Sequence, residues 1–127
     1  MATANLIGGW IGMLAGVASG ALIGLFFYRE DWMGGYESWR RRLTRLGHIS
    51  FFGLGFLNLL FAATAAQLHL QPGYQQTASA ALLAGAVTMP LCCFLSAWRK
   101  PLRHLFPVPV LSVGAGIAAI LIGWWRQ

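Results

Sequence analysis

Two histidines in this chain each open an apolar segment, and each lies close to an arginine. His48 comes three residues after Arg45, and His104 directly follows Arg103. Two imidazoles from neighbouring helices can ligate a haem b, and arginines can pair with its propionates. Gly55, two helical turns beyond His48, would let a flat ring approach. These five residues form one candidate cofactor site. The alternative is that both histidines lie at an interface, satisfied by water, head groups or helix ends.

Three sulfur side chains form a second candidate site within one apolar segment. Met89 and Cys93 are four residues apart and share a helical face, and Cys92 is three residues from Met89. Soft ligands of this kind select Cu(I) and similar ions. Methionine and free cysteine are also ordinary packing residues in apolar helices, which is the alternative interpretation. Two adjacent cysteines do not imply a disulfide framework.

The elements that must position these residues are apolar and long. The chain has 127 residues, of which 57% are hydrophobic and 9% charged, whereas a soluble domain carries about 25% charged residues. Mean hydropathy is +0.63. We therefore predict an all-α fold, a single integral membrane domain over 1–127 that forms a four-helix bundle. The expected membrane spans are 5–28, 48–70, 77–98 and 105–125.

Basic residues predict the orientation of these spans. The connections after the first and third spans contain eight of the nine lysines and arginines, and the opposite side has only Arg126. Because cytoplasmic loops are enriched in basic residues, we expect these two loops in the cytoplasm and both termini on the external, or periplasmic, side. The formal charge of +6 lies between apolar runs, so we expect no nucleic-acid partner.

The first basic connection has the pattern of an amphipathic helix over about 36–46. Apolar residues recur at spacings of three and four, and arginines fill the intervening positions. A helix of this kind lies in the head-group layer, so we predict a short cytoplasmic interfacial helix that contacts anionic lipid, or alternatively a platform for another subunit. Its lipid-facing basic segment comprises Trp39, Arg40, Arg41, Arg42 and Arg45.

Glycine recurs at every fourth position of the first expected span. A row of glycines makes a groove into which another helix backbone can fit. The groove could hold another helix of the same chain, a second subunit or a flat cofactor, and packing within the chain is the simplest of the three. The row consists of Gly8, Gly12, Gly16, Gly20 and Gly24.

The middle of each expected span lacks Asp, Glu, Lys and Arg. Ion-coupled transporters use an ionisable group at membrane depth, so we do not expect proton-coupled transport. The sequence also lacks a nucleophile–base pair and a phosphate-binding loop, and we expect no enzyme. The function predicted is a small accessory or anchor subunit of a larger, bioenergetic membrane complex, partnered by other subunits or by itself. The alternatives are a haem b- or quinone-binding electron carrier and a passive channel shaped by a kink at Pro90.

Overall fold

Residues 2–126 form an all-helical protein in a computed structural model, and they contain no strand. The sequence expectation of a four-helix bundle is confirmed. The long helices are α1 (Ala2–Phe26), α2 (Trp39–Thr64), α3 (Pro72–Trp98) and α4 (Pro107–Trp125), and two short 3-10 helices are η1 (Trp32–Gly34) and η2 (Lys100–Leu105).

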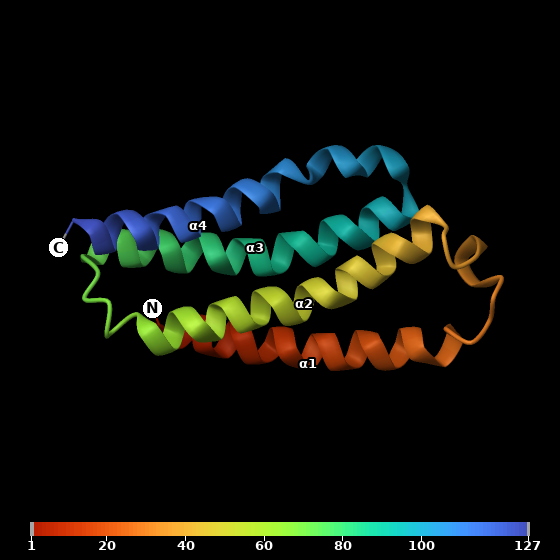
Figure 1. Cartoon of the computed structure of the whole chain (residues 1–127), viewed down its shortest axis with the longest axis horizontal. Helices are drawn as coiled ribbons and strands as arrows, with labels where there is room; N and C mark the ends of the chain where they lie inside the picture. Colours follow the sequence, from red (N-terminus) through yellow and green to blue (C-terminus); the bar gives the residue numbers. More distant parts are fainter. Residues whose placement is uncertain (1, 127) are drawn as a thin grey trace.

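Each long helix packs along the helix that follows it in the chain, so the order across the molecule is α1, α2, α3, α4 (Figure 1). α1 also contacts α3, less extensively, whereas within residues 2–126 α4 has no extensive contact with α1 or α2. The connections that contain η1 and η2 lie at one end of the bundle, and both termini lie at the other (Figure 1). We call the end with η1 and η2 the arginine end.

All four long helices are long and apolar enough to cross a membrane, as expected for a multi-pass membrane protein. α1, α2 and α3 have 25, 26 and 27 residues, and a bilayer core needs about 20. α4 has 19 residues and is extended at its start by η2. Prolines begin α3 and α4, where a missing N–H leaves no helical hydrogen bond unmade.

The helix expected over 36–46 is not a separate element, which corrects the sequence interpretation. α2 begins at Trp39 and continues through Gly47 to Thr64, so the arginines occupy its first two turns. Gly47 serves helix packing rather than a turn, because a Cβ there would lie 2.9 Å from the Phe94 ring on α3. The cost of a glycine inside a helix, about 1 kcal/mol, is too small to break α2 where it packs against a neighbour.

A tight turn and a capping serine connect α1 to α2. Gly34 and Gly35 have φ of 87° and 100°, a region that glycine adopts without steric cost. Ser38 is the N-cap of α2, and its hydroxyl oxygen accepts a hydrogen bond from the backbone N–H of Arg41 at 3.2 Å. The same hydroxyl donates to the carbonyl of Met33 at 2.7 Å. The start of α2 is therefore fixed by local hydrogen bonds of Ser38.

Candidate functional site

The glycine row of α1 is occupied largely by α2. A Cβ at Gly16 would lie 2.7 Å from the ring of Phe52, and a Cβ at Gly20 would lie 2.6 Å from the ring of His48. Gly24, the last member of the row, has nothing within 4 Å of the position that a Cβ would take. The first interpretation of the row, packing within the chain, therefore describes its middle, and one open position remains at the arginine end.

At Gly55 the backbones of α1 and α2 touch. A Cβ on Gly55 would lie 3.0 Å from the carbonyl oxygen of Gly9, and a Cβ on Gly12 would lie 3.2 Å from the Cα of Gly55. Small residues permit such contact in membrane helices. The space that we expected at Gly55 for a haem ring is thus filled by α1. Gly8 faces α3 instead, where a Cβ would lie 2.6 Å from the Leu83 side chain.

A buried polar cluster joins three helices near the end opposite the arginines. Asn5 of α1 donates to the amide oxygen of Asn58 on α2 at 2.6 Å, and accepts from the hydroxyl of Ser79 on α3. Asn58 in turn donates to the carbonyl oxygen of Leu82 at 3.2 Å. A buried amide inside an apolar helix needs hydrogen-bond partners, and the structure shows those of Asn58. Asn5, the first polar amide of an otherwise apolar span, was the sequence signal for one of them.

Arg41 is the most unexpected member of the basic segment. It was predicted to face lipid, but its side chain is only 2% exposed. Nη2 donates to the carbonyl oxygen of Phe27 at 2.7 Å, and Nη1 donates to those of Arg29 at 3.1 Å and Glu30 at 3.4 Å. These carbonyls follow the end of α1, where helical partners run out and the helix dipole is negative. Arg41 therefore clamps the C-terminus of α1 to α2.

Aromatic rings surround the two arginines of this region. The guanidinium carbon of Arg41 lies 4.5 Å from the ring centroid of Phe27 and 5.2 Å from that of Tyr36. Arg45 contacts the same tyrosine, with its guanidinium carbon 4.4 Å from the ring centroid of Tyr36. Cation–π contacts contribute about 0.5–1 kcal/mol at exposed sites and more where water is excluded. Tyr36 thus links the two side chains.

The rest of the basic segment divides between packing and exposure. The indole N–H of Trp39 donates to the carbonyl oxygen of Ser96 on α3 at 2.8 Å, so Trp39 joins α2 to α3. Arg40 and Arg42 are exposed and correspond to the expected basic face. The segment is therefore partly a surface and partly an internal joint.

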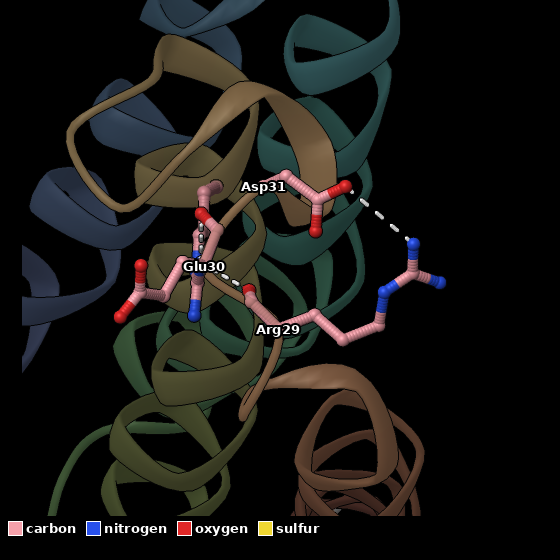
Figure 2. A network of polar contacts seen from close by, with 4 residues as sticks. Arg29, Glu30 and Asp31 are labelled. Carbon is pink, nitrogen blue, oxygen red and sulfur yellow. Dashed lines mark hydrogen bonds and ion pairs between the residues drawn. The ribbon is translucent and has the colours of Figure 1, made fainter.

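Acidic residues near the arginine end are few, and one of them is already paired. Figure 2 shows the side chain of Arg29 reaching Asp31, while Glu30 extends to the opposite side. The Arg29–Asp31 distance is 3.6 Å between Nη2 and Oδ2, and both side chains are largely exposed. A surface pair of this kind contributes about 0–1 kcal/mol. Asp31 is therefore no partner for the buried Arg41.

His48 is held against α1. Its Nδ1 lies 3.0 Å from the hydroxyl oxygen of Ser19, which itself donates to the carbonyl oxygen of Gly16 at 3.0 Å. Which of the two groups donates in the Ser19–His48 contact depends on the tautomer of the imidazole. Nε2 is left free of a protein partner among the described residues. The ring also packs edge-on against Phe52, with centroids 5.4 Å apart.

His104 and Arg103 lie elsewhere. Both belong to η2, both are exposed, and η2 packs on α3 and α4. A groove of about 360 Å³ beside His48 is lined by residues of α1, the adjoining Phe27 and α2, with none from η2. The structure therefore does not bring His48 and His104 into one pocket. It does bring His48 and Arg45 together, since both line this groove, which we call the His48 groove.

The sulfur residues point in different directions. Cys93 is fully buried and packs with Leu43 of α2, whereas Cys92 lies with its Sγ 3.8 Å from the carbonyl oxygen of Leu105 in η2. Both cysteines are free. Among residues 2–126, no group of three or more His, Cys, Asp and Glu side chains is arranged to hold a metal ion. Met89, the third residue of this candidate site, is partly buried on the same helix, α3.

A larger groove of about 460 Å³ lies between α1, α2 and α3. Its lining is apolar throughout and comprises Gly8, Ile11, Gly12, Ala15, Phe51, Leu83, Ala86, Val87, Pro90, Leu91 and Phe94. Pro90, which the sequence placed at a kink that shapes a path, lines this groove. The groove has no side chain that could coordinate an ion or orient a polar solute.

Comparisons of the chain with protein-family models, with curated proteins and with solved structures found no match. Fold and composition define a small multi-pass helical membrane protein. Its function is therefore inferred from its own residues.

Proposed function

We propose that this protein is a non-catalytic accessory subunit of a larger membrane assembly, and that it binds its partner through the outer face of α4. The observation that carries the proposal is the distribution of small residues on α4. Gly116 and Gly123 pack inward, where a Cβ would lie 2.9 Å from Leu82 and 2.8 Å from Tyr74. A second set remains exposed and consists of Gly114, Ala115 and Ala118.

Small residues four apart allow close helix association in lipid, where no hydrophobic force drives helices together. Gly114 and Ala118 have this spacing, and Gly114 has nothing within 4 Å of its Cβ position. The glycine row of α1, which could also have held a second subunit, is largely filled by α2. α4 is an end helix of the bundle and, among the described elements, packs extensively only on α3. Its outer face is therefore the better surface for a partner helix.

The test is co-purification in mild detergent, followed by mass measurement of the native particle. We expect a particle heavier than one 13.8 kDa chain with its detergent. Gly114→Leu should release the partner, because a leucine there blocks close approach. Gly53→Leu is the matched control, since Gly53 is also a helical glycine with nothing within 4 Å of its Cβ position. A wild-type monomer, or equal effects of the two variants, would contradict the proposal.

We further propose that the arginine end faces the cytoplasm, because eight of the nine basic residues lie at this end, in α2 and in the two connections. A membrane-impermeant maleimide applied to intact cells distinguishes the two orientations. Gln71→Cys, in the connection at the opposite end, should react, and Glu37→Cys should react only after the cells are opened. The reverse pattern would refute this orientation.

A second candidate, a haem- or quinone-binding electron carrier, is favoured by one observation. Nε2 of His48 has no hydrogen-bond partner among the described residues, and a hydrogen bond at the other ring nitrogen is how proteins orient a ligating imidazole. The bis-histidine version lacks support, since His48 and His104 line no common pocket. An absorption spectrum of protein expressed with added haem tests the haem version. A Soret band that His48→Ala abolishes would favour this candidate over the accessory subunit.

A further inference from the structure

The His48 groove combines two polar side chains with an apolar lining. Arg45 and His48 are the polar side chains, and the remaining lining residues are Gly20, Ile23, Gly24, Phe27 and Ile49. Gly24 contributes no side chain, and nothing within 4 Å occupies the position of its missing Cβ. The groove, of about 360 Å³, is therefore open beside Gly24, where the glycine row of α1 ends.

We propose that the His48 groove binds one acidic phospholipid. The phosphate lies between Arg45 and His48 beside the uncovered Gly24, and one acyl chain runs past Ile23 and Ile49 toward the middle of the bundle. This site is distinct from the partner surface on α4.

Arg45 is already oriented for an anion. Its guanidinium stacks on Tyr36, and Nη2 donates to the carbonyl oxygen of Tyr36 at 3.4 Å. A guanidinium has five N–H donors, so several remain for phosphate oxygens. Arg45 is half-buried, which weakens the screening that surface charges undergo. His48 can offer Nε2 as a second polar contact, because its Nδ1 is bonded to Ser19.

Charge around the groove favours an anionic head group over a neutral one. Residues 39–48 include four arginines and no acidic residue. Arg41 donates to the backbone carbonyls that follow α1. Asp31 is paired with Arg29, and Arg45 has no carboxylate partner among the described residues. Gly24 and Arg45 lie toward the arginine end of the groove, and His48 lies beside Gly20, one turn nearer the middle of α1.

Native mass spectrometry of the detergent-solubilised chain, titrated with phosphatidylglycerol or phosphatidylcholine, tests the proposal. We expect one tightly retained phosphatidylglycerol and no comparable phosphatidylcholine. Arg45→Gln should weaken retention about fivefold, the effect of one basic residue near a membrane surface. Gly24→Leu should weaken retention at least as much, because the leucine fills the open position of the groove without meeting protein atoms.

Two matched variants serve as controls. Arg42→Gln removes an equal charge from an exposed arginine that lines no groove, and Gly53→Leu adds an equal side chain to an open helical glycine. Neither should change retention. Equal losses for Arg42→Gln and Arg45→Gln would overturn the site in favour of diffuse surface charge. Equal binding of phosphatidylcholine would overturn the role of the anion.

Free glycerol phosphate distinguishes a lipid from a soluble phosphate. We expect it not to displace phosphatidylglycerol, since the acyl chain supplies much of the contact in the groove. Displacement at similar concentration, together with unchanged retention by Gly24→Leu, would refute the acyl-chain part of the proposal. Each variant is first checked for helical circular dichroism, and if one does not fold, the other still decides the outcome.

Discussion

Replacing Gly9 with alanine should separate α1 from α2, although the change adds only one methyl group. The new Cβ would lie 2.8 Å from the carbonyl oxygen of Gly55 and 2.7 Å from Cγ of Leu59. The leucine can rotate away, but the backbone oxygen moves only with the whole of α2. Overpacking of this kind costs about 1–3 kcal/mol.

Gly53→Ala is the control for this prediction. Gly53 also lies inside a long helix, and nothing lies within 4 Å of its Cβ position. Both variants gain about 1 kcal/mol of helix propensity, so this gain cancels when they are compared. We therefore expect Gly9→Ala to be less stable than Gly53→Ala by about 1–3 kcal/mol.

The assay is unfolding of the detergent-solubilised protein by increasing dodecyl sulfate, followed by near-ultraviolet circular dichroism. Gly9→Ala should unfold at a lower denaturant fraction than wild type, and Gly53→Ala at an equal or higher one. Coinciding transitions of the two variants would refute the close contact of the α1 and α2 backbones at Gly9 and Gly55.

Two further stability predictions concern buried polar groups. Arg41→Met should destabilise the fold by about 3 kcal/mol or more, because it leaves the carbonyls after α1 without donors, whereas Arg42→Met at an exposed position should change it by less than about 0.5 kcal/mol. The same unfolding assay measures both, and equal effects would contradict the clamp. Asn5→Leu and Asn58→Leu should each destabilise the protein, and a double-mutant cycle should give a coupling of about 0.6–1.7 kcal/mol for their hydrogen bond. Additive losses would show that this bond makes no contribution.

Long apolar segments in the sequence determined the number of long helices, the approximate bounds of α1, α3 and α4, and the end at which the arginines gather. α2 begins and ends earlier in the chain than the expected span of 48–70. These features depend on local composition, because a segment of about 20 apolar residues must satisfy its backbone internally as a helix wherever it lies.

Helix packing decided the remaining features. The arginine pattern around Arg41 has the same periodicity whether it faces lipid or the end of α1, and only the position of α1 shows which of its neighbours accept hydrogen bonds. In the same way, the sequence presents Gly20 and Gly24 as equivalent members of one row. Tertiary structure distinguishes them. α1 and α2 are in contact where His48 covers Gly20, and they move apart toward the arginine end, which leaves Gly24 uncovered (Figure 1).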